Sequence, residues 1–330
     1  MLTENLIKLI EKQAALVASL SLQTITMLTG LWSPFRQWTD HDLVLARAAR
    51  SATTVEAGQH AARMRQRAYM KFVYKELDIP YPNDIQIMVP GGVEVYPREV
   101  NPLEVYQRPA EQYRYHLSTG ATQAQAKFEA LQRLNTLIDT DLSLARREAA
   151  TDVYEATPTI LGWRRIIHPE LSKNGFSCGL CVVAADRVYS RGDLMPIHDL
   201  CNCDSLPITA DNDPGRELND DDLETIYDQA GSNTAGDLLN TKVYFLNHGE
   251  LGPIISGGAR QGSKQRKRAK LSKLEPEESL QRQIEQLKAS SQRLLARQKN
   301  GEDVRLSINW QRDRIQSLES QLAAMKRIRK

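Results

Sequence analysis

The sequence predicts an α+β protein with a helical N-terminal region, a small mixed α/β domain that carries a cysteine/histidine knot, and a C-terminal helical hairpin or coiled coil. Three observations predict this fold class. The 330 residues are 41% hydrophobic but only 6% aromatic, which is typical of an aliphatic, alanine-rich helical core. Apolar residues recur at helical spacing near both ends of the chain. Between these regions they alternate as in strands, around one stretch that holds all four cysteines.

The length leaves room for two domains, since a domain typically has about 100–200 residues. We expect a mainly helical region at 1–156, which includes a proline-rich arm at 80–109. The mixed α/β domain is expected at 157–255. A basic linker at 256–275 then leads to the helical hairpin or coiled coil at 276–330, and we expect this C-terminal part to project from the rest.

Two long helices are predicted at the start of the chain. Trp32–Pro34 ends the first, because proline cannot continue a helix. The second is capped by Thr39 or Asp40 and runs to about Leu77. The first helix has one apolar face, formed by Leu6, Leu9, Ile10, Leu16, Val17 and Leu20.

The uncharged stretch 13–35 in the first helix raises the question of a membrane span. A bilayer helix needs about 20 predominantly apolar residues. We expect a buried helix in a soluble protein instead, with no secretion signal and no membrane partner. Polar side chains interrupt the stretch, among them Gln13, Ser19, Ser21, Gln23, Thr24, Thr26 and Thr29.

Two further helices are predicted at 103–119 and 122–150, the second with a threonine cap. The segment 83–109 contains alternating Ile and Val and several prolines, and it is interpreted as a strand or hairpin arm. The arginines of the second long helix, Arg63, Arg65 and Arg67, are interpreted as a solvated face rather than a nucleic-acid contact.

The mixed domain is expected to begin with a strand at 160–168. Its last residue, His168, is expected to make a local hydrogen bond rather than to join a metal site. The acidic segment 211–228 is interpreted as a capped helix rather than a calcium site. A final strand is predicted at 241–246, and 248–255 is interpreted as an exit segment broken by glycines.

The five side chains Cys178, Cys181, His198, Cys201 and Cys203 form the main candidate site. Their pattern is C-x2-C, a gap, and then H-x2-C-x-C. A tetrahedral zinc ion takes four such ligands, so the pattern predicts a possible structural zinc site. The alternatives are buried reduced thiols, or the disulfides Cys178–Cys201 or Cys181–Cys203.

The gap between the two cysteine pairs has room for a short two-stranded excursion. Val188 and Tyr189 form its middle, and 191–193 makes a turn. A catalytic cysteine is not favoured, because no spacing in this stretch identifies a third group that would orient a base.

Charge is distributed unevenly along the chain. Residues 256–330 hold 19 basic and 8 acidic residues, whereas 1–255 hold 24 basic and 33 acidic residues. Such asymmetry predicts an anionic partner for the C-terminal part, such as DNA, although a solubilising linker has the same composition. The candidate phosphate-binding side chains are Arg260, Lys264, Arg266, Lys267, Arg268, Lys270 and Lys273.

The last 55 residues carry two heptad seams, which Asn300–Gly301 interrupts. Because the seams are short, we expect their stability to depend on a partner, with coiled-coil self-association as one possibility. The first seam consists of Leu280, Ile284, Leu287, Ser291 and Leu294. The second consists of Ile308, Ile315, Leu318, Leu322 and Met325.

Four segments together carry a family resemblance: CGLCVVAADRVYSRGDLMPIHDLCNC, with IIHPELS before it and DPGRELNDDDLETIY and NHGELGPI after it. They resemble the MuF-like minor head proteins of tailed bacteriophages, closest to the actinobacteriophage branch. The resemblance covers about residues 1–255, and the cysteine/histidine pattern is its specific part. Some relatives carry a C-terminal toxin domain, where this chain has its helical tail.

The resemblance implies a MuF-like fold for the mixed domain and a minor capsid protein near the portal vertex. Such a protein is present in few copies and acts in head assembly and in DNA packaging or ejection. Its expected partners are the portal protein and the major capsid or scaffold protein. Its expected location is the virion head, and the host cytoplasm during assembly.

Members of this branch are also commonly labelled capsid maturation proteases, which gives an alternative function. The chain contains no H-E-x-x-H. The residues that would have to carry proteolysis are Cys178, Cys181, His198, His248 and Glu250. A third alternative is a head protein that binds DNA through the basic tail.

Overall fold

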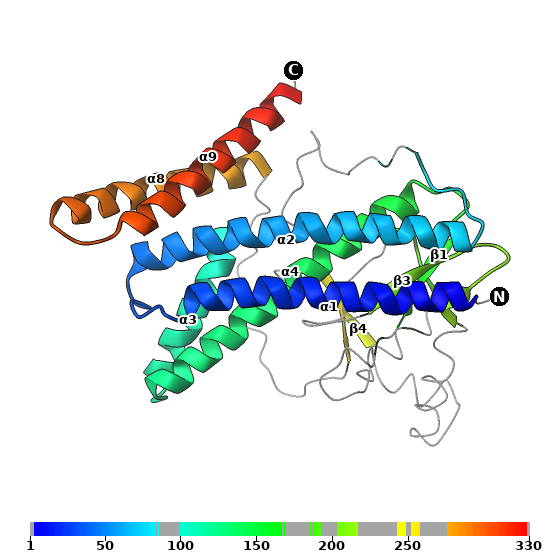
Figure 1. Ribbon diagram of the computed structural model, residues 1–330, viewed down its shortest axis with the longest axis horizontal. Helices are drawn as coiled ribbons and strands as arrows, with labels where there is room; N and C mark the ends of the chain where they lie inside the picture. The colour runs from blue at the N-terminus through cyan, green and yellow to red at the C-terminus, as the bar shows by residue number, and fades with distance from the viewer. Residues whose placement is uncertain are drawn as a thin grey trace. The chain divides into compact units, whose positions relative to one another are not determined.

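The computed structural model shows an α+β protein that is mostly helical, with a three-stranded antiparallel sheet and a separate two-stranded ribbon (Figure 1). The described residues are 3–83, 85, 100–166, 168, 185, 188–192, 203–216, 243–248, 252–257 and 276–328.

The chain divides into two compact units. Unit 1 consists of Met1–Leu20, Ala61–Gln86 and Ser143–Lys270. Unit 2 consists of Ser21–His60, Ile87–Leu142 and Leu271–Lys330. Three long helices contribute residues to both units, so the units interleave along the sequence rather than follow one another.

The first two helices have the predicted extents. Helix α1 spans Glu4–Trp32 and helix α2 spans His41–Glu76. The predicted cap at Asp40 is present, because its carboxylate accepts a hydrogen bond from the backbone N–H of Leu43 at 3.1 Å. This bond satisfies one of the N–H groups that have no partner within the first turn.

Helix α1 is long and apolar enough to cross a bilayer, by its length and composition alone. In the structure it also supplies core residues. Leu6 and Ile10 are buried in unit 1, and Leu28 and Trp32 are buried in unit 2. The expectation that the protein has no membrane partner stays a prediction.

Helices α3 and α4 follow the next two predicted patterns. Helix α3 spans Pro102–Ser118, and α4 spans Gln123–Glu155, five residues beyond the predicted end. Thr122 and Gln125 form a reciprocal cap at the start of α4: the Thr122 hydroxyl accepts from the Gln125 N–H, and the Gln125 side chain accepts from the Thr122 N–H.

The proline-rich arm predicted at 80–109 is wrong for its last part. Pro102 and Pro109 lie in α3, and the Asn101 side chain accepts a hydrogen bond from the helix backbone. Pro102 fits the first helical position because proline lacks an N–H group that would have no partner there. Residues 84 and 86–99 lie outside the described residues.

The sheet of unit 1 has the strand order β2-β1-β3, and both pairings are antiparallel. Strand β1 spans Gly162–Ile166, β2 spans Val188–Tyr189 and β3 spans Asp204–Ile208. Strand β1 confirms the predicted strand at 160–168. Val188 and Tyr189 of the gap form β2, which pairs with β1, and most of the predicted two-stranded excursion lies outside the described residues. The core beside this sheet includes Leu6, Ile10, Met70, Val73, Tyr74, Val153, Tyr154, Trp163 and Leu206.

A second ribbon corrects the prediction for 248–255. Strand β4 spans Val243–His248, as predicted in outline, and β5 spans Gly252–Gly257. The strands pair antiparallel with His248 opposite Gly252. Residues 252–257 therefore form a second strand rather than an exit, and 249–251 lie outside the described residues.

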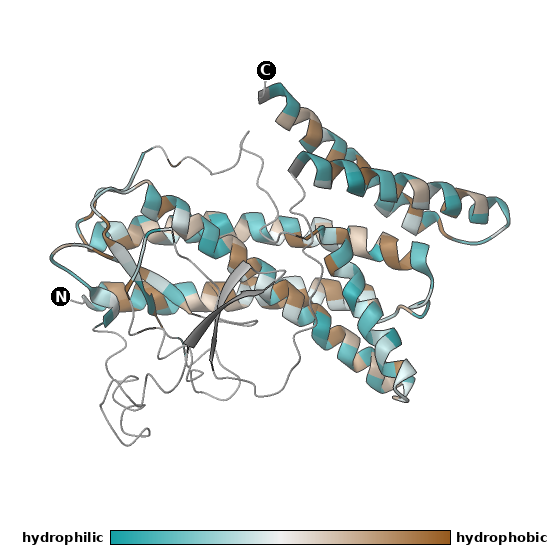
Figure 2. Cartoon of the chain, turned by 180° about the vertical axis from the view of Figure 1, so that it is seen from behind, coloured by the Kyte–Doolittle hydropathy of each residue, from teal (hydrophilic) through white to brown (hydrophobic). Residues whose placement is uncertain are grey.

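The C-terminal hairpin is confirmed, but its predicted projection from the rest of the chain is wrong. Helix α8 spans Pro276–Lys299 and α9 spans Arg305–Ile328, and they pack side by side (Figure 1). Brown and teal residues are interspersed along both helices, as amphipathic helices require (Figure 2). The hairpin belongs to unit 2 and shares a core there, which contains Leu45, Ala49, Leu103, Ile284, Leu287 and Leu318.

The reversal between α8 and α9 lies at the predicted interruption. Gly301 has a φ of 92°, a conformation that side chains disfavour. The two seams therefore face each other within one chain. The two seams pack against each other, and residues of α2 and α3 complete the same core. The partner that the seams were expected to need is therefore present within the chain.

Gly162 is expected to be intolerant of any side chain. A Cβ atom there would collide with the backbone carbonyl oxygen of Tyr189, which belongs to the neighbouring strand. We expect Gly162→Ala to destabilise unit 1 by about 1–3 kcal/mol, because rigid backbone cannot make room. Gly30→Ala is the matched control: nothing lies within 4 Å of its Cβ position, and alanine favours a helix by about 0.5–1 kcal/mol. Urea unfolding of both variants checks this, and equal effects would contradict it.

Candidate functional site

Most of the predicted zinc ligands are not among the residues that the structure describes. Cys178, Cys181, His198 and Cys201 lie outside the described residues. Cys203 is described, and it is buried directly before β3. Within the described ranges no group of three or more His, Cys, Asp or Glu side chains is placed to hold a metal ion. The zinc site therefore stays a prediction.

The other predicted sites are covered only in part. His248 is the last residue of β4, and Glu250 lies outside the described residues. His168 is buried at the end of the β1 segment. The seven basic residues of the linker also lie outside the described residues, namely Arg260, Lys264, Arg266, Lys267, Arg268, Lys270 and Lys273.

The C-terminal end of the cysteine-rich stretch is bound to helix α4 by buried polar side chains. Arg146 Nη1 donates to Asp204 Oδ2 at 3.1 Å, and Arg146 Nη2 donates to the carbonyl oxygen of Cys203 at 3.2 Å. The side chains of Arg146 and Asp204 are 4% and 5% exposed. One helix thus holds both a backbone and a side-chain group of the stretch at the point where it enters β3.

A second contact binds the next residues of the same segment to α4. The Tyr154 hydroxyl, two turns along α4 from Arg146, lies 3.0 Å from Ser205 Oγ. The other oxygen of Asp204, Oδ1, accepts from the backbone N–H of Ser205 at 2.9 Å. We call Arg146, Tyr154 and the segment Cys203–Ser205 the β3 anchor.

The tyrosines near the β3 anchor stay protonated. Burial raises the pKa of Tyr69 well above its usual value, and the nearby Asp204 carboxylate raises it further. Burial also raises the pKa of Tyr154, although its hydrogen bond with Ser205 acts in the opposite direction. Both hydroxyls are therefore protonated and neutral at neutral pH.

The middle of β1 carries a second arginine–carboxylate pair. Arg164 donates to both oxygens of Asp213, with Nε at 2.9 Å from each and Nη2 at 2.6 Å from Oδ2. Arg164 Nη1 also donates to the carbonyl oxygen of Ala185 at 3.2 Å. Asp213 is an acid of the segment interpreted as a capped helix, and here it fixes the segment after β3 to β1.

An aromatic stack covers the other strand pair of the sheet. The Trp163 and Tyr189 rings, which lie opposite each other on β1 and β2, stack at 4.4 Å between centroids. The Arg165 guanidinium lies 5.1 Å from the Trp163 ring centre and 4.8 Å from the Tyr189 ring centre. This cation–π arrangement stabilises a charged side chain that is 1% exposed.

The interpretation of the α2 arginines as a solvated face is wrong for two of the three. Arg63 is buried and pairs with Glu148 of α4 at 2.7 Å, and Arg67 pairs with Asp152 at 3.1 Å. The four-residue spacing of the two carboxylates on α4 matches that of the two arginines on α2. Arg65 is half-buried, and its Nη1 atom donates to the carbonyl oxygen of Leu16 in α1 at 3.2 Å.

A small cavity lies beside the β3 anchor within unit 1. Its volume is about 10 Å³, close to the space that one water molecule needs. Its walls include the side chains of Gln66, Arg146, Arg147, Trp163, Arg165 and Asp204.

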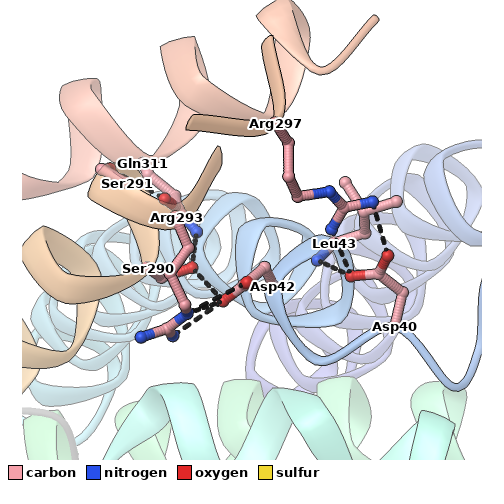
Figure 3. A network of polar contacts seen from close by, with 8 residues as sticks. All are labelled: Asp40, Asp42, Leu43, Ser290, Ser291, Arg293, Arg297 and Gln311. Carbon is pink, nitrogen blue, oxygen red and sulfur yellow. Dashed lines mark hydrogen bonds and ion pairs between the residues drawn. The ribbon is translucent and has the colours of Figure 1, made fainter. Parts of the chain in front are cut away.

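In unit 2, arginines of α8 bind carboxylates at the start of α2 (Figure 3). Asp42 accepts hydrogen bonds from Arg293 at 2.8 Å and from the Ser290 hydroxyl at 2.9 Å. Asp40 forms an ion pair with Arg297 at 2.8 Å. The carboxylates that begin α2 therefore also hold the hairpin.

These contacts lower the pKa of both carboxyl groups. Burial acts to raise the pKa of Asp40, but hydrogen bonds from Arg297 and the Leu43 N–H outweigh it. Burial likewise acts to raise the pKa of Asp42, and the hydrogen bonds from Arg293 and Ser290 outweigh it. Because both pKa values are lowered on folding, their stabilising effect is present above about pH 4 and is lost as the pH falls below it.

The deepest contact of the hairpin is made by Arg314 of α9. Its Nη2 atom donates to Glu56 Oε1 at 2.6 Å and to Gln283 Oε1 at 3.3 Å, and its Nη1 atom pairs with Glu56 Oε2. The Arg314 side chain is fully buried, and that of Glu56 is 28% exposed. The hairpin is thus held at both ends of its contact with α2, by Asp40 and Asp42 at one and by Glu56 at the other.

Sequence reasoning missed the β3 anchor and the hairpin contacts. The residues involved are single arginines and acids on helices, which local pattern reading assigns to solvent. One signal was present: Arg314 directly precedes Ile315 and lies one helical turn before Leu318, so it borders the predicted apolar seam of α9. A charged side chain beside such a seam is rarely buried unless it is paired.

No protein-family model, no curated protein and no solved structure matches this chain.

Proposed function

We propose that the protein is a structural minor head protein of a tailed bacteriophage, associated with the portal vertex and acting in head assembly and in DNA packaging or ejection. The portal protein and the major capsid or scaffold protein are its proposed partners. The virion head is its proposed location. The proposal starts from the four sequence segments that resemble MuF-like proteins, of which the cysteine-rich stretch is the most specific.

The β3 anchor is the observation that carries a structural rather than a catalytic role for that stretch. Its end is fixed to α4 by Arg146, Tyr154 and Asp204, all of them buried. An arginine side chain stays protonated at the pH values at which proteins work, so it cannot act as a general base. A buried guanidinium that binds a carboxylate and a backbone carbonyl holds two segments together, as a protein under load in a capsid requires.

The alternative is a capsid maturation protease, which would depend on groups such as His248 and Glu250. Proteolysis needs a nucleophile or an activated water, together with a base within hydrogen-bonding reach. At the β3 anchor, the ionisable side chains that the structure describes include the Arg146 guanidinium, the Asp204 carboxylate that binds it, and the protonated tyrosines Tyr69 and Tyr154. That composition favours the structural role.

The two functions predict different results for a phage that lacks this gene and is complemented with variants. We expect His248→Gln and Glu250→Gln to leave processing of scaffold and capsid subunits intact, because a structural protein does not turn over a substrate. We also expect mass spectrometry of purified virions to count only a few copies of the protein per portal. Gels of infected cells show subunit processing. Unprocessed capsid subunits with either variant would reverse the choice, and absence of the protein from virions would exclude both the structural role and the portal location.

A further inference from the structure

The segment 21–60 of unit 2 keeps an excess of positive charge when the hairpin is docked. It contains three acids and three arginines, which are Arg36, Arg47 and Arg50. Arginines of the hairpin bind all three acids, in the pairs Asp40–Arg297, Asp42–Arg293 and Glu56–Arg314, of which the first two are drawn in Figure 3. The segment's own arginines form no ion pair with any carboxylate that the structure describes, so their charge is not compensated there.

Arg47 is held in one orientation by its surroundings. Its guanidinium lies 4.2 Å from the ring centre of Phe35 and 5.6 Å from that of Trp310, which belongs to α9. Its Nη1 atom donates to the carbonyl oxygen of Leu31 in the last turn of α1. Rings that lie over a guanidinium leave the N–H groups in its plane free to donate. The side chain is therefore fixed before any ligand arrives, which lowers the entropy cost of binding.

One edge of the Arg47 guanidinium is open to solvent. Its Nε and Nη2 atoms have no hydrogen-bond partner in the part of the chain that the structure describes, and neither atom is enclosed. The two N–H groups on this edge match two oxygens of a phosphate or a carboxylate. Burial also lowers the pKa of Arg47 to about 10, and no carboxylate raises it again. The side chain stays charged at neutral pH, and an anion at this edge would supply the missing compensation.

The groups around this edge favour a phosphate backbone over an acidic peptide. Arg36 adjoins Phe35, Arg50 lies one turn beyond Arg47 on α2, and both are exposed. All three arginines are donors only. A nucleic-acid backbone presents a row of charged acceptors, whereas an acidic peptide also brings backbone N–H groups that an arginine cannot accept.

We propose that Arg47 binds a backbone phosphate of DNA through Nε and Nη2, and that Arg36 and Arg50 bind neighbouring phosphates. Because Trp310 is part of the site, the docked hairpin completes it. The site is separate from the seven basic residues between 260 and 273, and it does not depend on the proposed role in the phage head.

The variant Arg47→Lys tests the site because it removes the planar pair of donors and keeps the charge. We expect the full-length protein to bind a fluorescent DNA duplex of about 20 base pairs, and the Kd of Arg47→Lys to be about tenfold higher. Fluorescence anisotropy measures both values. Arg282→Lys, the same change at an exposed position of α8, should keep the wild-type Kd. No binding by the wild type, or equal Kd values for Arg47→Lys and the wild type, would overturn the proposal.

The double variant Arg36→Gln/Arg50→Gln tests the neighbouring contacts without disturbing the fold. Both side chains are exposed and make no hydrogen bond or ion pair with described residues, so the Tm should match that of the wild type. Each phosphate contact adds about 0.9 to the slope of log Kd against log salt concentration. We expect the slope to fall by about 2, and an unchanged slope would contradict the role of these two arginines.

The NMR signal of the Arg47 Nε–H group reports the site directly, and its loss in Arg47→Lys identifies it. We expect this signal to shift when the duplex is added to the full-length protein, and to shift less with polyglutamate at the same charge concentration. DNA that binds only through the basic tail would leave the signal in place, which would overturn the proposal. A larger shift with polyglutamate would also overturn it and would assign the site to an acidic protein partner.

Discussion

Replacing Arg146 by methionine is expected to destabilise the protein by about 3–5 kcal/mol. The change leaves Asp204 as a buried carboxylate without its cation, and removing one partner of a buried pair typically costs that much. It also removes the donor to the Cys203 carbonyl. Methionine and arginine have similar helix propensities, so the loss reports the β3 anchor rather than α4 itself. Urea unfolding followed by circular dichroism gives the free energy of unfolding.

The double variant Arg146→Met/Asp204→Asn should recover part of that loss, because it removes the unpaired charge together with its partner. Arg305→Met is the matched control, since Arg305 pairs with Asp303 on the surface and both side chains are at least 74% exposed. It should leave the unfolding midpoint unchanged. A loss below about 1 kcal/mol for Arg146→Met would mean that the anchor is not a stabilising contact.

Replacing Arg314 by methionine is expected to release the α8–α9 hairpin from α2. The guanidinium of Arg314 is fully buried, pairs with Glu56 and also binds Gln283. We expect amide hydrogen exchange in α8, α9 and the Leu45–Ala49 turn of α2 to accelerate about 100-fold, which corresponds to about 3 kcal/mol. Exchange in β1 and β3 should not change, because they belong to unit 1.

Lys288→Met is the control for this experiment, because the Lys288–Glu319 pair joins the two hairpin helices at the exposed surface. Its exchange should match that of the wild type, since such pairs contribute little. Acid offers a second route to release: with the pKa values of Asp40 and Asp42 lowered, protonation below about pH 4 should weaken the same contact. If Arg314→Met left the protection of α8 and α9 intact, the apolar contacts alone would hold the hairpin.

The hairpin contact changes the interpretation of the basic C-terminal part. Arg293, Arg297 and Arg314 bind Asp42, Asp40 and Glu56, so these three cations neutralise acids of the same chain. They are not available to an external phosphate while the hairpin is docked. The seven basic residues between 260 and 273 and exposed ones such as Arg282, Lys326 and Arg327 remain candidates for a DNA contact of the tail, and that contact stays a prediction.

The sequence by itself determined the elements whose signals are local. The extents of α1 and α2 follow from apolar periodicity, a proline after Trp32 and the cap at Asp40, all of which act within a turn or two of the helix end. The hairpin reversal at Gly301 was predictable for the same reason. The α+β class followed from the sum of these patterns.

Only the tertiary structure decided which charged side chains meet. Arg63 and Glu148 lie 85 positions apart, and Arg314 and Glu56 lie 258 apart, so no local pattern relates them. Local reading assigned the α2 arginines to solvent and the hairpin to a projecting tail, because charged side chains usually face water. Here packing brings opposite charges together at the same spacing. Because these contacts are buried, each charged side chain depends on its oppositely charged partner for its stability.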